Sequence, residues 1–188
     1  KPTGVFDLRQ TIGYRNYDGY SADTHLDLPR FGDFSVKLDG VVTRRDGTTD
    51  NPLSGQQDYN GYDRKGFHIR TLWEPTEAFS ADYSFDISYD ATTPFYNQLL
   101  DKNPAAAPLS PLVQIQTTRA EVADIGVPLR ESIGKTRGHT LNMELALANG
   151  DTLRSISSYR ELTQSQWDNG GAHSAAFAPN ARFGRYSM

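Results

Sequence analysis

The stretch Phe79–Asp90, FSADYSFDISYD, alternates strictly between apolar or small side chains and polar ones. Successive side chains of an extended strand point to opposite faces, whereas a helix would scatter both sets around its circumference. One face would carry Ala81, Tyr83, Phe85, Ile87 and Tyr89, and the other Asp82, Ser84, Asp86, Ser88 and Asp90. The pattern predicts a β-strand whose two faces meet very different surroundings.

Similar alternation returns elsewhere in the chain and predicts an all-β fold. Besides Phe79–Asp90, the predicted strands are Gly4 to Tyr17, Ser21 to Leu28, Phe34 to about Arg44, Gly66 to Trp73, His139 to Leu147 and Leu153 to Leu162, with an eighth beginning near Arg182. Turn residues such as Asp18-Gly19 separate several of them and are typical of hairpins. We expect an antiparallel up-and-down meander of about seven or eight long strands.

The predicted connections differ in length in a regular way. Short turns at 29–33, 74–79 and 148–151 alternate with long loops at 44–63, 90–137 and from 161 onward. Alternate connections of a meander lie at the same end of the sheet, so the long loops and the 16–19 hairpin would share one rim. Outer-membrane β-barrels have this arrangement. A soluble β-sandwich with its apolar faces turned inward has the same alternation, and the pattern alone leaves both open.

Composition narrows the classes of partner and chemistry. The chain has 188 residues, a formal net charge of -4 and no basic stripe, so we expect no nucleic-acid partner. It has no cysteine, which excludes disulfides, thiolate metal sites and a cysteine nucleophile. The sequence contains no run of 18 apolar residues, so it predicts no transmembrane helix. Average hydropathy does not detect membrane-spanning strands, which are apolar only at every second position.

Catalytic and metal-binding motifs are missing from the sequence. The histidines His25, His68, His139 and His173 lie far apart, and Asp46, Asp50 and Asp58 do not have the spacing of a calcium loop. Nucleophile-elbow, Walker and dinucleotide-binding motifs do not occur either. We therefore expect no metal, no cofactor and no enzymatic activity.

Two groups of residues are candidates for contact with a ligand. Aromatic rings beside polar groups in the predicted long loops offer stacking area and orientation for a small molecule or oligosaccharide. These loop candidates are Arg44, Arg45, Tyr59, Tyr62, Asp63, Phe95, Tyr96, Asn97, Gln98, Trp167 and Asp168. The second group shares the polar side of the strands and is predicted to face a barrel lumen: Lys37, Asp39, Arg70, Asp82, Ser84, Asp86, Ser88 and Glu144.

Several segments in order resemble the β-barrel of TonB-dependent outer-membrane receptors, most of all the N-terminal third of that barrel directly after the plug domain. They are PTGVFDLRQTIGYRNYDGY (2–20), LDLPRFGDFSVKLDGVVTRRDG (26–47), YDRKGFHIRTLWEPTEAFSADYSFDISYD (62–90), ADIGVPL (123–129), and LRSISSYREL (153–162) followed by WDNGGA (167–172). The resemblance covers essentially the whole chain, and it rests on the order of the segments because no single segment is specific.

The resemblance implies both a fold and a function. In this family a 22-stranded barrel surrounds a plug and imports scarce ligands such as ferric siderophores, cobalamin or oligosaccharides. Residues 1–188 would then be a partial barrel, without plug domain, TonB box or C-terminal strands, in the outer membrane of a Gram-negative bacterium. The implied partners are outer-membrane lipid and, through the parent protein, the plug domain and the TonB-ExbB-ExbD system. The alternatives are a soluble secreted β-sandwich that binds glycans and a small outer-membrane hydrolase with a Ser/His pair.

Overall fold

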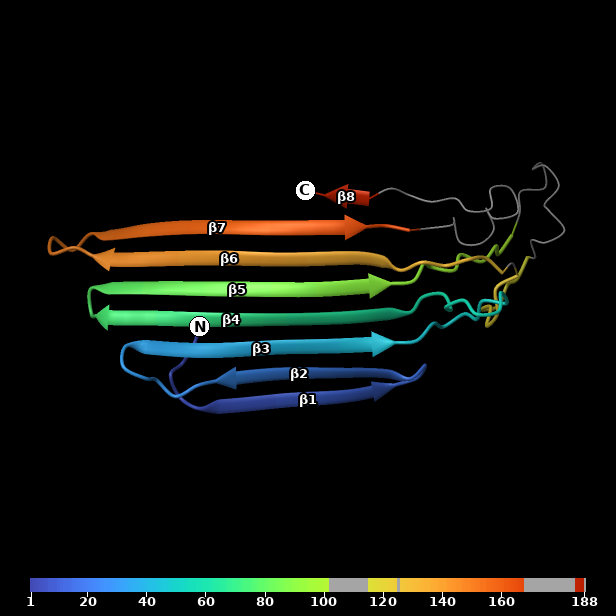
Figure 1. The fold of residues 1–188 in the computed structure, drawn as a ribbon. Helices are drawn as coiled ribbons and strands as arrows, with labels where there is room; N and C mark the ends of the chain where they lie inside the picture. Colours follow the sequence, from blue (N-terminus) through green and yellow to red (C-terminus); the bar gives the residue numbers. More distant parts are fainter. Residues whose placement is uncertain (102–114, 125, 168–184, 188) are drawn as a thin grey trace.

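A single antiparallel sheet forms the body of the molecule (Figure 1). The computed structural model describes residues 1–101, 115–124 and 126–167 and the backbone of 185–187. The sheet has the order β1-β2-β3-β4-β5-β6-β7-β8, so every strand pairs with its neighbours in sequence. The strands are β1 (Asp7–Arg15), β2 (Gly19–Asp27), β3 (Phe34–Arg45), β4 (Tyr62–Thr76), β5 (Phe79–Thr92), β6 (Ser132–Ala146), β7 (Thr152–Ser165) and β8 (Arg185–Ser187).

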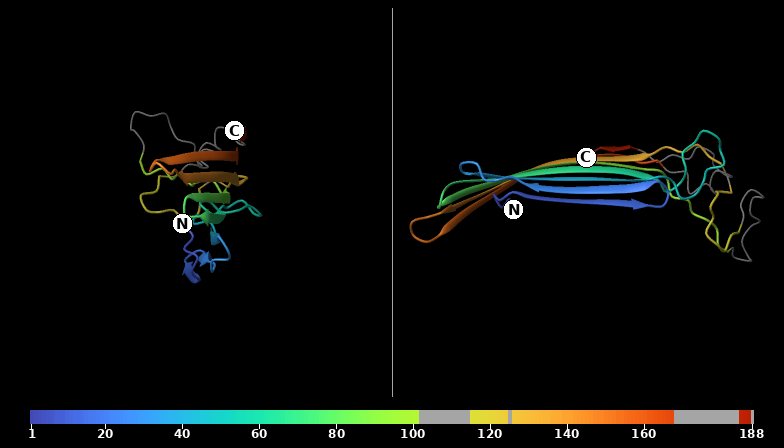
Figure 2. Two further views of the ribbon diagram at one scale, coloured as in Figure 1. Left: turned by 90° about the vertical axis from the view of Figure 1, so that its left-hand side faces the viewer. Right: turned by 90° about the horizontal axis from the view of Figure 1, so that it is seen from below.

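The predicted antiparallel meander is confirmed, with seven long strands and a three-residue eighth. The sheet is open, because β1 and β8 are its two edges. It is a twisted single layer when seen from below (Figure 2). A sandwich needs a second sheet facing the first, and the strands within the described residues all belong to one sheet.

Strand β5 confirms the alternation of Phe79–Asp90. Directly opposed residues of paired strands point to the same face. The face that carries Tyr83, Phe85 and Ile87, here called the apolar face, therefore continues across the neighbouring strands. Its members include Leu8 and Ile12 of β1, Leu26 of β2, Val36, Leu38 and Val42 of β3, Phe67 and Ile69 of β4, and Leu141 and Met143 of β6. The opposite side is the polar face.

Several strands are longer than predicted, and β7 runs to Ser165, past the start of the loop predicted from 161 onward. β4 begins at Tyr62 and runs through the predicted turn residues to Thr76, and β6 begins at Ser132 rather than His139. Charged residues and glycines at the added ends hide the apolar period. Pairing of residues 62–65 of β4 and 132–138 of β6 with β5 satisfies the backbone polar groups there. Pro75, which has no N–H to donate, lies where the β4–β5 register shifts between Trp73 and Thr76.

The predicted division into two rims is confirmed (Figure 1). The connections 28–33, 77–78 and 147–151 lie at one end, the short-turn rim. The connections 16–18, 46–61 and 93–131 lie at the other end, the long-loop rim. In the β1–β2 hairpin Tyr17 and Asp18 have positive φ, so the turn uses these residues and Gly19 begins the next strand.

The largest buried cluster lies in the loops rather than on the sheet. Tyr59 is fully buried with Ala123, Val127 and Leu129, and Tyr96 packs against this cluster. Parallel bridges join Asp50 to Val122 and Leu99 to Ile115. Residues 46–61 and the described residues of connection 93–131, which are 93–101, 115–124 and 126–131, thus form one packed unit at the long-loop rim, here called the loop cap. The described part of the chain contains no helix that is long and apolar enough to cross a membrane.

Candidate functional site

The polar face brings together the eight residues that were predicted to share it. The strand registers place Lys37, Asp39, Arg70, Asp82, Ser84, Asp86, Ser88 and Glu144 on this one side of the sheet. The strand pairing shows that these residues share one face. That this face lines a barrel lumen stays a prediction. Several groups of contacts connect them or link them to neighbouring strands, including a bond between Ser88 and Thr136 and one from Arg154 to Glu144.

The first group joins three strands through one carboxylate. Asp39 lies between His25 of β2 and His68 of β4 in a cross-strand row. The Nδ1 atom of His25 is 2.6 Å from one oxygen of Asp39, and that of His68 is 3.0 Å from the other. Both oxygens accept hydrogen bonds when each imidazole carries its proton on Nδ1. The carboxylate therefore fixes two imidazoles on either side of β3.

The second group is the bidentate ion pair of Arg70 and Asp82. Arg70 donates from Nε to one oxygen of Asp82 at 2.7 Å and from Nη2 to the other at 2.6 Å. Asp82 is buried, with 7% of its surface exposed. A buried carboxylate without a partner is costly, and the planar guanidinium satisfies both oxygens at once. The pair holds β4 and β5 together near the short-turn rim.

The third group crosses an intervening strand. Arg160 of β7 donates from Nη2 to Asp86 of β5 at 2.7 Å, although β6 lies between them. The residue of β6 in the same row is Gly138. A Cβ atom there would lie 2.9 Å from both the Arg160 Nη2 atom and the Asp86 carboxylate. Because Gly138 has no side chain, the Arg160 guanidinium can reach the Asp86 carboxylate across β6.

Arginines gather around Tyr62 where the polar face reaches the long-loop rim. Arg15 donates from Nη1 to the Tyr62 hydroxyl at 3.2 Å. The guanidinium carbons of Arg45 and Arg64 lie 5.0 Å and 4.8 Å from the centre of its ring. Arg64 also pairs with Asp90 at 3.0 Å. The Tyr62 ring is thus held among three guanidinium groups, one of which is paired with a carboxylate.

A cavity of about 380 Å³ lies next to this cluster. It brings together four of the predicted loop candidates, Arg44, Arg45, Tyr62 and Asp63, with Asp46, Asp58 and Glu131 also in its wall. All four candidates lie in strands rather than loops, at the ends of β3 and β4. Arg45 and Tyr62 belong to the polar face, whereas the paired Arg44 and Asp63 belong to the apolar one.

One group of loop candidates has structural partners. Tyr59 is fully buried and contacts the ring of Tyr96 at a centroid distance of 5.4 Å. Tyr96 donates to Asp124 at 2.8 Å, and burial together with this hydrogen bond raises the pKa of its phenol to about 12. Gln98 bonds three backbone groups of the segment 116–120. These side chains build the loop cap, so a ligand at its surface would not touch Tyr59.

The other loop candidates lie apart from that core. Phe95 and Asn97 are exposed, with 67% of the Phe95 surface open to solvent. Trp167 follows β7, where its ring lies 5.0 Å from the guanidinium carbon of Arg130 and its backbone bonds the Ser132 hydroxyl. Asp168 lies outside the described residues. The structure therefore does not bring the predicted loop candidates into one site.

Sequence reasoning missed Arg15 and Arg64. Arg15 is 47 residues from Tyr62 in sequence. The two residues meet only because strands β1, β2, β3 and β4 pair in succession and in a fixed register. The signal was present in the alternation, because Arg64 shares its strand face with Tyr62 at a spacing of two. The strand pairing needed to include Arg15 was not known from the sequence.

The imidazoles bond carboxylates and a phenol. His25 and His68 contact Asp39, and the Nδ1 atom of His139 is 2.7 Å from the Tyr83 hydroxyl. His173 lies outside the described residues. Within the part of the chain that the structure describes, no group of three or more His, Cys, Asp or Glu side chains is placed to hold a metal ion.

Aromatic rings mark both ends of the apolar face. Near the short-turn rim Phe31 stacks on Phe34, Phe34 stacks on Trp73, and Trp73 meets Phe79 edge to face. Near the long-loop rim lie the phenols of Tyr14, Tyr20 and Tyr89. Large apolar side chains between the two ring groups are exposed, among them Ile12 at 75% and Ile87 at 47%. Among the described residues, no second layer covers this apolar band.

The chain was compared with known proteins at the level of family, sequence and structure. No protein-family model matches it, and neither the curated proteins nor the solved structures give a significant match.

Proposed function

We propose that the chain is part of the wall of a transmembrane β-barrel in the outer membrane of a Gram-negative bacterium. The barrel belongs to an active importer of the TonB-dependent receptor type. Its cargo is a scarce ligand such as a siderophore-bound iron, a vitamin or an oligosaccharide, and its partners are membrane lipid, a plug domain and the TonB-ExbB-ExbD system. The single observation that carries the proposal is the exposed apolar face bounded by aromatic rings at both rims.

The dimensions of this face support a membrane. Phe79 and Tyr89 lie ten residues apart on β5. At about 3.4 Å per residue they are separated by about 34 Å along the strand. With the tilt of about 45° usual in membrane barrels, that separation spans about 24 Å of bilayer. Outer-membrane barrels carry an apolar band about 25 Å tall between aromatic girdles.

The two rims and the polar face support transport. Short turns at one end and long loops at the other are the arrangement of outer-membrane barrels. On the polar face the Arg70–Asp82 and Arg160–Asp86 pairs and the imidazole-bound Asp39 form a charged wall. Such a wall suits contact with a plug or a hydrated ligand path. The arginines around Tyr62 lie where a ligand would enter from the long loops.

Purification with and without detergent tests the proposal. A sheet with an open apolar face should aggregate in buffer and become monodisperse in dodecyl maltoside micelles or lipid nanodiscs. Size-exclusion chromatography with light scattering would measure this. A chain that stays monomeric and folded in buffer alone would contradict the membrane assignment. The genomic sequence upstream of Lys1 gives an independent check, because the proposal expects a plug domain and a signal peptide to be encoded there.

A further inference from the structure

A groove of about 660 Å³ lies on the apolar face toward the long-loop rim. Its floor includes Phe67 of β4 and Ile87 of β5. Gly40 of β3 widens it, because a Cβ atom there would meet nothing within 4 Å. The floor is therefore apolar, and the missing side chain of Gly40 leaves open space beside Phe67.

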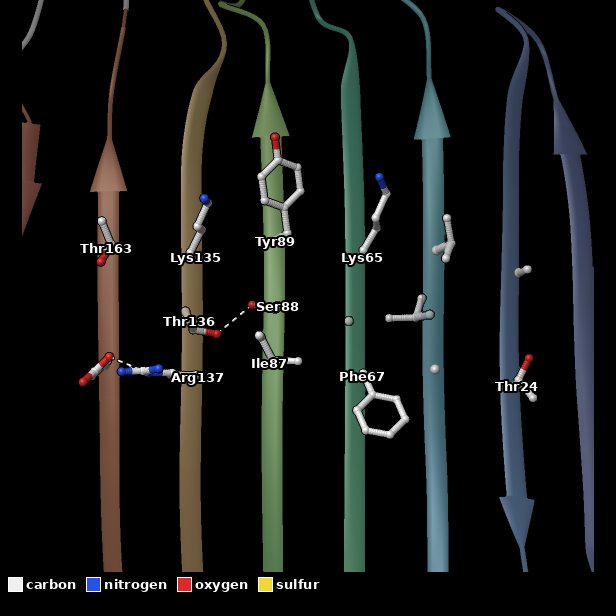
Figure 3. A pocket seen from close by; sticks show the side chains of 16 residues that line it. Thr24, Lys65, Phe67, Ile87, Ser88, Tyr89, Lys135, Thr136, Arg137 and Thr163 are labelled. Atoms are coloured by element: carbon white, nitrogen blue, oxygen red, sulfur yellow. Dashed lines mark hydrogen bonds and ion pairs between the residues drawn. The ribbon is translucent and has the colours of Figure 1, made fainter.

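Cations surround the upper end of this groove (Figure 3). Lys65, Tyr89 and Lys135 form one cross-strand row. The two ammonium groups lie 5.8 Å and 5.9 Å from the centre of the Tyr89 ring, on either side of it. Arg137 lies two residues further into the groove on β6. Two lysines thus lie at the level of Tyr89, and Arg137 lies deeper, in the row of Ile87 and Phe67.

Most of these cations have an acidic partner, but one does not. Lys65 lies 3.0 Å from Asp63, and Arg137 lies 2.5 Å from Glu161. Among the described residues, Lys135 is in no ion pair and its contact is with Tyr89. The net charge of the five groups is therefore +1, located at Lys135. An anionic group would complete the row, and an apolar chain would fill the floor below it.

We propose that this groove binds a phosphate-bearing amphiphile of the surrounding membrane. The phosphate lies at Lys65, Tyr89 and Lys135, and an acyl chain runs over Ile87 and Phe67 toward the short-turn rim. The depth agrees with this orientation, since Tyr89 marks the aromatic level where lipid headgroups begin. Lysines whose stems cover apolar surface while their ammonium groups reach the headgroups suit that boundary. The inference rests on the proposed function, because it requires the apolar face to meet lipid.

Lipid binding to the detergent-solubilised chain tests the inference. Native mass spectrometry would follow titration with dioleoyl phosphatidic acid, with dioleoylglycerol as the matched lipid that has no phosphate. We expect retention of phosphatidic acid and little retention of the diacylglycerol. The double variant Lys65→Gln/Lys135→Gln should bind phosphatidic acid about 25-fold more weakly, because a basic side chain near an anionic headgroup contributes about a fivefold effect.

Two control variants separate the site from general charge and from misfolding. Lys1→Gln/Arg9→Gln removes the same charge, with Arg9 on the polar face, and should leave binding unchanged. Lys65→Arg/Lys135→Arg keeps both charges and should retain binding within about threefold, since Arg also binds phosphate. Circular dichroism of each variant would establish that the sheet has formed.

Other outcomes would overturn the inference. Equal retention of both lipids, or wild-type binding by the Gln double variant, would show an ordinary lysine-bearing membrane surface. Displacement of the lipid by millimolar inorganic phosphate would show a site for free phosphate. These failures differ from failure of the proposed function, because a chain that needs no detergent would fail the earlier test before any lipid is added.

Discussion

At the scale of single residues, the absence of a side chain at Gly138 permits an ion pair between two other strands. Gly138 has no side chain to obstruct the contact between Arg160 and Asp86 across β6. The atoms that a new Cβ would meet are the ends of two flexible side chains rather than backbone. The cost of filling this space is therefore a lost ion pair more than a strained strand.

Gly138→Ala tests this reading. We expect Arg160 to turn away from Asp86 and the free energy of unfolding to change by less than about 1 kcal/mol, because exposed ion pairs contribute little. Alanine also suits a strand better than glycine, which offsets part of the loss. A structure of the variant together with denaturant unfolding would measure both effects. A loss of several kcal/mol would show that the backbone itself requires glycine.

Tyr96 supplies a pH-dependent signal from the loop cap. Burial and the hydrogen bond to Asp124 raise the pKa of its phenol to about 12, against about 10 for an unfolded tyrosine. The neutral phenol therefore stabilises the loop cap fully below about pH 10, and this contribution is lost as the pH rises toward 12. Near-ultraviolet absorbance should show tyrosine ionisation that continues toward pH 12. Tyr96→Phe should lower the amplitude of this late phase by one tyrosine, and an unchanged amplitude would assign the phase to other residues.

At the scale of elements, the fold was predictable where the two faces differ and unpredictable where they do not. Strand β5 keeps aromatic and aliphatic residues on one side for its whole length, so its period is plain in the sequence. The first half of β6 places Lys135 and Arg137 on the apolar face, which removes the contrast. Its strand structure comes from pairing with β5, a tertiary effect that a local pattern does not contain.

The candidate site divides in the same way. The eight polar-face residues could be grouped from the strand period alone, because alternation assigns each strand residue to one of the two faces. The arginine cluster at Tyr62 depends on four strands in register, and the cap core depends on contacts between connections 46–61 and 93–131. Loops have no period from which such contacts could be predicted. The sequence therefore predicts ligand contact for Tyr59, whereas in the structure this side chain is fully buried.

The loop cap is expected to unfold as one unit. Tyr59→Ala removes its only fully buried large side chain among the described residues and should cost about 3 to 5 kcal/mol locally. Hydrogen exchange should then rise together in segments 46–61 and 115–131, while the central strands keep their protection. Phe95→Ala is the matched control, because that ring is exposed and its loss should change exchange little. Faster exchange in one loop only would contradict a shared core.

At the scale of the whole molecule, the two faces should respond differently to the same charge. Ile69 lies on the apolar face midway between the aromatic rims, and Thr140 lies on the polar face. Ile69→Arg should destabilise the protein in lipid by about 2 to 4 kcal/mol, as expected for a cation near the bilayer midplane. Thr140→Arg should cost much less. Urea titration in lipid vesicles compares them, and equal costs would count against a lipid-facing surface.

Nearest-neighbour pairing throughout the sheet also has a consequence for the order in which the strands assemble. The β6–β7 hairpin closes over five residues, 147–151, whereas β5 and β6 must meet across the 39 residues of 93–131. The longer closure costs about 1.8 kcal/mol more chain entropy, at about 0.6 kcal/mol for each doubling of length. We expect β4–β5 and β6–β7 to form as separate hairpins that join later. The loop cap, by holding 46–61 against 93–131, would then stabilise the join between two halves of the nascent wall.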